Sequence, residues 1–492
     1  MRERLRFYFG EELIEIASCD PTLTLLDWLR LERRRTGSKE GCAEGDCGAC
    51  TVVIGRLDGG RLRYEAINAC IRFLLTLDGC HLLTVEHLKG TDGRLHPVQQ
   101  AMVDCHGSQC GFCTPGFVMS LFALWLNEDR PSVARIEDAL AGNLCRCTGY
   151  EPIIQAAQRL YERGDRANDR FALASPAMVK RLDALADGET LALADGSRRF
   201  FAPASVEALA DLLSVYPEAV LVAGATDVGL WITKGMQQPA TVIYLGRLDE
   251  LRTISDQGGH LRIGAMVNHI DTRKALAELS PQLDELMRRF GGEQVRNAGT
   301  IGGNIANGSP IGDLPPALIA LGATLVLRHG DEGRELPLEN FFLDYRKQDR
   351  QPGEFVEAVL VPKLPEDALF HISKISKRFD EDISAVCGAF LLRWDAGGII
   401  TEARLAYGGM AGIPKRAAAA EAALLGQEWN GTSVAAAIAA LPQDFTPLTD
   451  MRASAGYRLK VAGNLLRRFL IETSEPETET RVAGLLAEAA HG

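Results

Sequence analysis

The sequence predicts a multidomain α+β protein, and three observations lead to this: its length, the succession of strand and helix patterns, and the grouping of its cysteines. At 492 residues, the chain is long enough for three or four domains of about 150 residues each. Strand-like runs fill its beginning, helical periodicity follows, and a mixed region with glycine-rich turns makes up the rest. Eight of the 12 cysteines fall into two groups of four, which points to metal sites.

Residues 1–84 are predicted to form a small α+β domain, and residues 85–165 a four-helix bundle. The first domain has strand-like runs at Leu5–Phe9, Thr51–Ile54 and Leu62–Tyr64, and one helical stretch at Thr24–Arg33. Apolar residues at three- and four-residue spacing predict the bundle helices, which are His96–Cys105, Pro115–Asn127, Val133–Ala141 and Ile153–Arg163. Pro115 can occupy a first helical turn, where its missing N–H costs nothing.

The second half of the chain is predicted to hold a linker and two further domains. The linker covers residues 166–192, which are charged and poor in strand-forming residues. A mixed α/β region with glycine-rich loops follows over residues 193–366. The last domain, residues 367–492, has strand-like runs at Ala385–Trp394 and Ile399–Tyr407, then an alanine-rich helical stretch and a charged, frayed tail.

The composition predicts a cytoplasmic protein that binds neither nucleic acid nor membrane. A net charge of −12 argues against nucleic acid or an anionic membrane surface as a general partner. The start, MRERLRFYFGEEL, does not have the pattern of a signal peptide, and no run of about 18 apolar residues predicts a spanning helix. Because disulfides rarely persist in a reducing compartment, the cysteines need another explanation.

The first cysteine group consists of Cys42, Cys47, Cys50 and Cys70, with four, two and nineteen residues between successive members. This is the plant-type ferredoxin spacing for a [2Fe–2S] cluster, whereas a four-cysteine zinc site usually shows two CxxC pairs. A loop that turns three thiolates inward often needs positive φ angles, which Gly41, Gly45 and Gly48 tolerate. Its backbone N–H groups can then point at the sulfurs. We therefore predict a [2Fe–2S] cluster at this group.

The second group consists of Cys110, Cys113, Cys145 and Cys147, with thirty-one residues between the two pairs. Four thiolates at helix ends inside a bundle can hold either zinc or a cluster. A single residue between two ligands is less usual for zinc, and a neighbouring cluster on the same chain favours iron and sulfide. The other four cysteines are interpreted as buried small apolar residues: Cys19, Cys80, Cys105 and Cys387.

The stretches QCGFCTPG (Gln109–Gly116) and GNLCRCTGY (Gly142–Tyr150) closely resemble the xanthine dehydrogenase and aldehyde oxidase family of molybdenum hydroxylases. The resemblance covers essentially the whole chain. YGGMAGIPKRA (Tyr407–Ala417) and SKRFDEDISAV (Ser376–Val386) are similar to the small iron–sulfur and flavin subunit of bacterial members. The resemblance implies that the second group holds a [2Fe–2S] cluster and that Gln109 lies beside molybdopterin, although such a residue is ordinarily an exposed polar one.

Two turns of small residues, Leu221–Val228 and Thr300–Asn304, are candidates for binding the phosphates of a cofactor. Neither is a GxGxxG fingerprint, so a Rossmann site is not indicated. Small residues let backbone N–H groups approach pyrophosphate oxygens, although glycine turns are more often simply turns. The resemblance implies that VAGATDVG and GTIGGNIANGSPIGD are the FAD-binding stretches of a vanillyl-alcohol-oxidase-type flavin domain, and that residues 367–492 form an α+β C-terminal flavoprotein domain.

The FAD contacts implied by the resemblance are Leu221, Val222, Ala223, Gly224, Ala225, Thr226, Asp227, Val228, Phe290, Thr300, Gly303, Asn304, Asp313, Val356 and Lys374. The Asp313 carboxylate could accept hydrogen bonds from ribityl or ribose hydroxyls, and it could also cap a helix ahead of Pro315. Phe290 is implied to face the flavin ring, although an aromatic residue at that place is ordinarily core. Lys374 is implied to place positive charge near the flavin, and its ordinary alternative is a solvated surface lysine.

The resemblance implies an electron-transfer subunit that serves the oxidation of hypoxanthine or xanthine to urate. Electrons would pass from molybdenum on a partner chain to the second cluster, the first cluster, FAD and finally NAD⁺. No molybdenum-binding domain is recognised in the chain, so a molybdopterin-binding large subunit in an (αβ)2 heterotetramer is expected. Tyr345 and residues 377–382 match segments near the NAD⁺ site of relatives, but Phe379 follows Arg378 where some relatives have paired arginines.

Two alternatives remain open from the sequence. The first is a subunit of an aldehyde oxidase-type hydroxylase that passes electrons to oxygen or another acceptor. The second is a non-catalytic adaptor with zinc at both four-cysteine groups. Xanthine itself follows from the resemblance, because no residue of this chain is expected to touch the purine.

Overall fold

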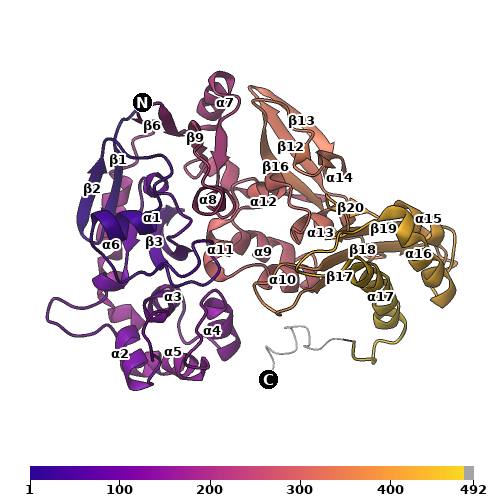
Figure 1. Ribbon diagram of the computed structural model, residues 1–492, viewed down its shortest axis with the longest axis horizontal. Coiled ribbons are helices and arrows are strands. Elements are labelled where there is room, and N and C mark those ends of the chain that lie inside the picture. Colours follow the sequence, from indigo (N-terminus) through magenta and orange to yellow (C-terminus); the bar gives the residue numbers. More distant parts are fainter. Residues whose placement is uncertain (481–492) are drawn as a thin grey trace. The chain divides into compact units, whose positions relative to one another are not determined.

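The computed structural model, drawn as a ribbon in Figure 1, describes residues 1–480. The chain divides into two compact units. Unit 1 comprises Met1–Asp249 together with Gly291–Gly299, and unit 2 comprises Glu250–Phe290 and the chain from Thr300 onward. The chain therefore enters unit 1 a second time, for nine residues. This division falls inside the predicted 193–366 domain, and the predicted domain boundaries stay predictions. The predicted charged tail lies largely outside the described residues.

A five-stranded mixed sheet begins unit 1, in the order β2-β1-β5-β3-β4. Its strands are β1 (Leu5–Phe9), β2 (Glu12–Ile16), β3 (Thr51–Asp58), β4 (Arg61–Asn68) and β5 (His81–Leu83). Alternate residues of β1 are buried, as a half-buried strand requires. The predicted helical stretch is a short helix, α1 (Leu25–Asp27), continued by a π-helical turn at Trp28–Glu32. Thr24 caps it by accepting from the N–H of Asp27.

Four helices follow, as predicted: α2 (Pro97–Asp104), α3 (Thr114–Asn127), α4 (Val133–Leu140) and α5 (Glu151–Arg163). Helix α3 is the central one, because every residue from Gly116 to Trp125 is buried. A helix that is apolar on all sides is stable in water only when it is surrounded by protein. Pro115 lies in its first turn, as predicted. The segment predicted as a linker contains a further helix, α6 (Arg170–Asp183).

A second sheet completes unit 1, in the order β6-β7-β9-β8. Its strands are β6 (Leu191–Asp195), β7 (Arg198–Ala202), β8 (Val220–Val222) and β9 (Thr241–Tyr244). Helices α7 (Val206–Val215) and α8 (Val228–Thr233) connect these strands along the chain, whereas α11 (Glu293–Ala298) packs on β4 of the first sheet. Phe200 and Val242 of this sheet share one buried cluster with Phe7 and Leu25 of the first sheet. The two sheets of unit 1 are therefore joined by a continuous core.

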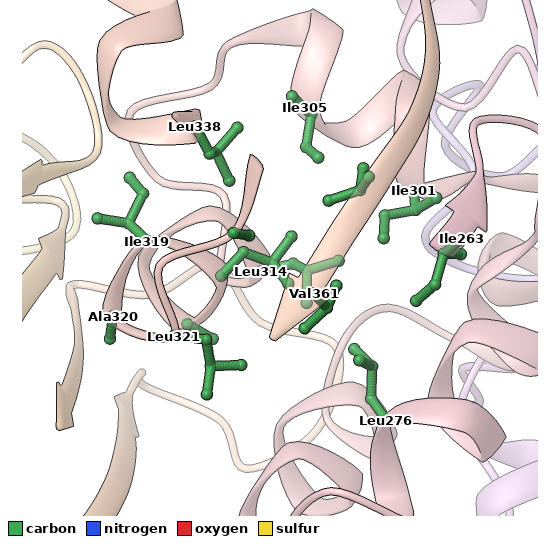
Figure 2. Packing of buried hydrophobic residues seen from close by; sticks show 14 of the residues in the cluster. Ile263, Leu276, Ile301, Ile305, Leu314, Ile319, Ala320, Leu321, Leu338 and Val361 are labelled. Carbon is green, nitrogen blue, oxygen red and sulfur yellow. The ribbon is translucent and has the colours of Figure 1, made fainter. Parts of the chain in front are cut away.

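Unit 2 contains a five-stranded antiparallel sheet in the order β10-β11-β16-β12-β13. Its strands are β10 (Ile254–Asp256), β11 (His260–Gly264), β12 (Thr324–His329), β13 (Glu332–Pro337) and β16 (Phe355–Pro362). Its helices are α9 (His269–Ala277), α10 (Pro281–Arg288), α12 (Ile301–Asn307), α13 (Leu314–Ala320) and α14 (Leu338–Phe341), and a small hairpin joins β14 (Phe342–Asp344) and β15 (Lys347–Gln348). Figure 2 shows the core between helices and sheet, where Ile263, Leu276, Ile301, Leu314 and Val361 gather.

The C-terminal part of unit 2 is a four-stranded antiparallel sheet covered by helices. Its strands are β17 (Leu369–Ile375), β18 (Val386–Trp394), β19 (Ile400–Gly408) and β20 (Lys415–Arg416), and its helices are α15 (Ala418–Leu424), α16 (Gly431–Asp444) and α17 (Ala455–Ser474). β18 and β19 confirm the two strands predicted here. Phe390, Tyr407 and Phe469 form the aromatic centre of its core. Among residues 1–480, no helix is both long and apolar enough to cross a membrane.

Candidate iron–sulfur and flavin sites

The first cysteine group gathers at one end of the β3–β4 pair. Thr51 and Asn68 lie opposite each other in the two strands. Cys50 just before β3 and Cys70 just after β4 therefore meet, and their Sγ atoms are 3.2 Å apart and buried. Cys42 Sγ accepts the backbone N–H groups of Glu44 and Cys47 at 3.4 Å each, as predicted for the loop. Hydrogen bonds from the Cys47 and Cys70 thiols lower the pKa of Cys42, and the same bonds raise the pKa of each donor thiol.

Glycines shape this loop in two different ways. Gly45 (φ +79°) and Gly48 (φ +67°) adopt the left-handed conformation, as predicted. Gly41 does not, and Ala43 (φ +55°) takes that conformation instead. A Cβ at Gly41 would lie 2.7 Å from Cys47 Sγ. The expectation of a positive φ at Gly41 is therefore wrong, because glycine is needed there to make room for a sulfur atom.

The second cysteine group forms two pairs between helix ends. The Sγ atoms of Cys110 and Cys147 are 3.6 Å apart, and the thiols of Cys113 and Cys145 are also hydrogen-bonded neighbours. Partial burial would raise the pKa of Cys145, but hydrogen bonds from Thr148 and from the Cys147 N–H lower it. Cys110 and Cys147 are exposed. Cys113 and Cys145 are half-buried and pack against the core of the bundle. The group therefore lies at the edge of the bundle, with one pair of cysteines half-buried and the other pair open to solvent.

Both groups have the donor set that an iron–sulfur cluster requires: four gathered thiols, with N–H groups or a hydroxyl aimed at a sulfur. The sulfurs approach in contacting pairs. The eight cysteines therefore fit two thiolate-bound clusters as the groups that each set would hold.

The two cysteine loops contact each other directly. The backbone N–H of Leu144 donates to the carbonyl oxygen of Cys47 at 3.0 Å, so one hydrogen bond joins the main chains of the two loops. Glycines make the approach possible: a Cβ at Gly48 would lie 2.1 Å from the Gly142 oxygen, and a Cβ at Gly116 would lie 2.2 Å from the Gly48 oxygen. A Cβ atom at either position would collide with the main-chain atoms opposite it. The structure therefore brings the two candidate cluster sites side by side within unit 1.

Helix α8 touches the first cysteine loop with its C-terminal end. The Thr233 hydroxyl donates to the carbonyl of Ala43 at 2.7 Å, and the Lys234 ammonium donates to that of Cys42 at 2.5 Å. The helix begins at Val228, which is the last residue of the first candidate flavin stretch. One short helix thus connects that stretch to the cysteine loop.

The first flavin stretch forms the turn between β8 and α8 in unit 1. Ala225 has a left-handed backbone (φ +62°), and a Cβ at Gly224 would lie 1.8 Å from the carbonyl oxygen of Ala298. Since the obstacle is backbone, only glycine fits at position 224. Asp227 precedes α8 but its side chain makes no capping hydrogen bond. A tight turn of small residues with this geometry suits the approach of a phosphate to the main chain.

The second flavin stretch, in unit 2, is the beginning of helix α12 rather than the predicted turn. Thr300 caps the helix by accepting from the N–H of Gly303 at 3.1 Å. Asn304 Oδ1 is buried and has no hydrogen-bond partner among residues 1–480. An unpaired buried acceptor is destabilising, and a donor group of a bound cofactor would satisfy it. This stretch therefore fits a polar cofactor such as FAD.

Two further candidates, Asp313 and Lys374, form a buried ion pair in unit 2. Lys374 Nζ donates to Asp313 Oδ2 at 2.5 Å, and the Ser384 hydroxyl donates to Oδ1 at 2.5 Å. Asp313 does precede α13, but its side chain does not cap that helix. Lys374 is 7% exposed. The alternatives of a capping aspartate and of a solvated lysine are therefore both wrong, because each side chain is satisfied by the other.

The remaining candidates are placed as follows. The ring of Phe290 is half-buried, with its centroid 4.6 Å from that of His269. Val356 is buried in β16, and Gln109 is exposed beside Cys110. The ungrouped cysteines are buried, as predicted, at Cys80, Cys105 and Cys387, and half-buried at Cys19.

The segment predicted to lie near NAD⁺ is an exposed turn in unit 2. The carboxylate of Asp382 accepts the backbone N–H groups of Lys377 and Arg378 at 2.9 Å each. The ring of Phe379 stacks with Arg289, whose guanidinium carbon lies 4.3 Å from the ring centroid. Tyr345, the other residue predicted for this site, is also exposed.

Sequence reasoning missed three polar residues beside the cysteine loops: Lys234, Asn143 and Gln294. Asn143 Nδ2 donates to the Gly48 carbonyl at 3.1 Å, and Gln294 Nε2 donates to Asn143 Oδ1 at 3.0 Å. A single polar residue in a helix or turn carries no signal of burial. The sequence does place glycines near two of them: Gly142 precedes Asn143, and Gly291 and Gly292 lie shortly before Gln294. These glycines were the available indication that main chains approach each other closely there.

Three family models match successive parts of the chain. A [2Fe-2S] binding domain matches residues 84–158, and the FAD binding domain in molybdopterin dehydrogenase matches residues 196–364. The CO dehydrogenase flavoprotein C-terminal domain matches residues 371–473. The order of the three models agrees with the order of the sites described above.

Similar proteins carry the names xanthine dehydrogenase and aldehyde oxidase. Xanthine dehydrogenase of Emericella nidulans is 34% identical over 499 residues, which cover 90% of this chain and 36% of that protein. Aldehyde oxidase 1 of Rattus norvegicus is 31% identical over 482 residues, which cover 87% of this chain and 36% of that protein. The chain thus spans about a third of the length of these relatives.

Solved structures point to the same family. A chain of carbon monoxide dehydrogenase from Hydrogenophaga pseudoflava matches with a TM-score of 0.52 and 32% identity, covering 55% of this chain and 94% of that chain. A chain of the enzyme from Oligotropha carboxidovorans matches with a TM-score of 0.52 and 28% identity, covering 56% and 97%. Taken with the three family models, these likenesses show that the chain belongs to the xanthine dehydrogenase, aldehyde oxidase and CO dehydrogenase family.

Proposed function

We propose that this chain is the iron–sulfur and flavin electron-transfer subunit of a molybdenum hydroxylase, of the xanthine dehydrogenase type. The observation that carries this is the contact between the two four-cysteine loops through Leu144 and Cys47. Two redox groups held by adjoining loops suit electron exchange, whereas two structural zinc sites have no need of adjacency. When bound, the clusters supply one-electron chemistry, and FAD supplies storage of an electron pair for hydride transfer.

The two cysteine groups would play different parts. Cys50 and Cys70 of the first group are buried, and Cys42 and Cys47 are half-buried, so this group is partly shielded from water. The second group has exposed thiols, and Phe112 and Tyr150 beside them are exposed aromatic residues. Exposed aromatic groups favour protein–protein contact. We therefore place the molybdopterin-binding partner, with Gln109 as a contact, at the second group.

The proposed FAD-binding residues are those of the two flavin stretches together with Phe290, Asp313, Val356 and Lys374. The backbone turn at Gly224 would approach the pyrophosphate. Asn304 Oδ1 is available to accept a hydrogen bond. The Asp313–Lys374 pair would present one fixed polar group to the cofactor, since its members hold each other in place.

NAD⁺ is the proposed electron acceptor, and purine oxidation the proposed reaction of the complex. Lys377 and Arg378 place two cationic side chains on an exposed turn that also carries three acidic residues, and these cations are the groups that would meet a dinucleotide phosphate. One observation favours a different acceptor, as in aldehyde oxidase-type enzymes: Phe379 stands against the guanidinium groups of Arg288 and Arg289. The ring covers part of both guanidinium groups and so leaves less positive charge accessible to a pyrophosphate.

Anaerobic reduction tests the acceptor. Addition of NADH to the purified, cofactor-loaded protein should bleach its visible absorbance, and the EPR signals of reduced clusters should follow. Reduction by dithionite but not by NADH would contradict the NAD⁺-linked function and support oxygen or a carrier as acceptor. A colourless protein containing zinc would contradict the electron-transfer function itself.

A further inference from the structure

We propose that Gln294 is a positioning residue that clamps the two cysteine loops to each other. The inference rests on the proposed function, because it concerns the fixed spacing of the two redox groups. Gln294 is 1% exposed and lies in helix α11, within the nine-residue segment by which the chain re-enters unit 1. It is thus a single side chain from a distant part of the sequence, inserted where the two loops meet.

The amide of Gln294 is the centre of a buried polar network. Its Nε2 lies 3.1 Å from Thr51 Oγ1, 3.1 Å from Ser120 Oγ and 3.0 Å from Asn143 Oδ1. Thr51 directly follows the ligand Cys50, and Asn143 lies two residues before the ligand Cys145. One amide therefore donates to both cysteine loops at once.

The other members of the network converge on the loop of the first group. The Thr51 hydroxyl donates to the Gly48 carbonyl at 2.6 Å, and Asn143 Nδ2 donates to the same oxygen at 3.1 Å. The Ser120 hydroxyl donates to Asn143 Oδ1 at 2.6 Å. Thr51, Ser120 and Asn143 keep these mutual bonds if the Gln294 amide is removed. A substitution at Gln294 therefore weakens the clamp without leaving its partners unsatisfied.

Close packing fixes the amide in place. A Cβ at Gly142 would lie 2.0 Å from Gln294 Oε1, and Gly142 in turn lies against Gly48. The side chain thus backs the Gly142 main chain at the point where that main chain meets the first loop. Movement of one loop away from the other is opposed both by the hydrogen bonds and by this contact.

The segment that carries Gln294 is anchored independently. Asn297 Nδ2 donates to the Ala66 carbonyl in β4 at 3.0 Å. Arg135 of helix α4 binds both carboxylate oxygens of Glu293, at 2.7 and 3.2 Å. Loss of the Gln294 amide should therefore leave α11 where it is, which separates a role in clamping from a general role in folding.

The test compares Gln294→Met with Asn297→Leu in the complete, cofactor-loaded chain. Methionine keeps the length of glutamine but donates no hydrogen bond. Asn297→Leu removes a buried hydrogen bond from the same helix, but it leaves the loop network and the Arg135–Glu293 anchor of the helix intact. With both clusters reduced, we expect the magnetic splitting between their EPR signals to be narrowed or lost in Gln294→Met and preserved in Asn297→Leu. Hydrogen exchange over residues 140–148 should be faster in the first variant alone.

The outcomes decide the proposal separately from the proposed function. An unchanged splitting in Gln294→Met, or an equal change in both variants, would overturn the clamping role. If Gln294→Met loses iron, exchange over residues 140–148 is decisive, and exchange as slow as in the unmodified chain would overturn the role. A failure of the proposed function is recognised differently, because the unmodified chain would then show no cluster signal.

Discussion

Lys374 and Asp313 form an ion pair across 2.5 Å, although neither side chain is more than 6% exposed. Lys374 lies in β17 and Asp313 just before α13, so the bond joins the C-terminal sheet of unit 2 to the helix that follows the second flavin stretch. The Ser384 hydroxyl donates a hydrogen bond to the other oxygen of the carboxylate. Charges so far from water are tolerated when they are paired and hydrogen-bonded.

Removal of one member of this pair should destabilise unit 2 strongly. We expect Lys374→Met to lower the free energy of unfolding by about 3–5 kcal/mol, because the buried Asp313 carboxylate loses the cation that is hydrogen-bonded to it. Addition of Asp313→Asn to that variant should restore most of the loss. The matched control is Lys363→Met, which breaks the exposed pair with Asp256 and should cost less than about 1 kcal/mol. Equal losses at the two lysines would contradict this account of the pair; denaturant unfolding measures both.

Replacement of Lys234 should shift the potential of the first cluster alone. Its ammonium donates to the carbonyl of the ligand Cys42 at 2.5 Å, and a nearby positive charge favours the reduced, more negative form of a cluster. Lys234→Met should therefore lower that midpoint potential, by on the order of tens of millivolts since the side chain is partly exposed. Potentiometric titration followed by EPR measures the shift. The same shift in Lys180→Met, an exposed lysine of α6, would show a non-specific charge effect.

A methyl group at Gly224 should greatly reduce flavin binding. The added Cβ would meet the Ala298 carbonyl at 1.8 Å, so the turn of the first flavin stretch has to move. We expect Gly224→Ala to be purified with its iron but with much less FAD than the unmodified chain. Gly259→Ala, where no atom lies within 4 Å of the added group, serves as control. Full FAD content in Gly224→Ala would remove this turn from the proposed flavin site.

Burial of His81 predicts an acid-sensitive unit 1. His81 is 3% exposed beside the Tyr64 hydroxyl, and its burial lowers its pKa to about 4. In the unfolded chain, His81 has the ordinary histidine pKa of about 6.5. The unfolded chain therefore binds a proton more readily than the folded chain, and acid favours unfolding. The contribution of neutral His81 to the free energy of unfolding should be fully present above about pH 6.5. It should fall by up to roughly 3 kcal/mol as the pH approaches 4.

Comparison with His81→Gln isolates this effect. The urea midpoint of the variant should depend less on pH between 7 and 5 than that of the unmodified chain. Other acid-sensitive groups, including the cysteine ligands and the half-buried His87, contribute equally to both proteins. The same pH dependence in the two proteins would assign the acid sensitivity to other residues.

Much of the secondary structure could be predicted, because the local pattern determines it. The run from Leu5 to Phe9 alternates and is a strand, and Pro115 opens an apolar helix whose whole middle is buried. The two groups of four cysteines could be recognised as candidate metal sites because the spacing of such ligands follows from metal geometry. What local patterns do not contain is the meeting of distant segments, such as the insertion of Gln294 between loops more than 140 residues earlier.

The errors have the same origin. Gly41 needs space for the sulfur of Cys47 rather than an unusual φ, and only the folded loop shows that neighbour. Lys374 looks like a surface residue until Asp313 is placed beside it. The glycine-rich run after Thr300 predicts a turn, but it forms a helix that is capped by Thr300 and packs on β11.

The most direct test of the central claim is a stepwise reductive titration of the anaerobically purified chain, followed by EPR after iron and FAD have been measured. The account predicts about four iron atoms and one FAD per chain, with two distinct cluster signals that each integrate to about one spin when fully reduced. Zinc in place of iron, or a single cluster signal at full reduction, would contradict it.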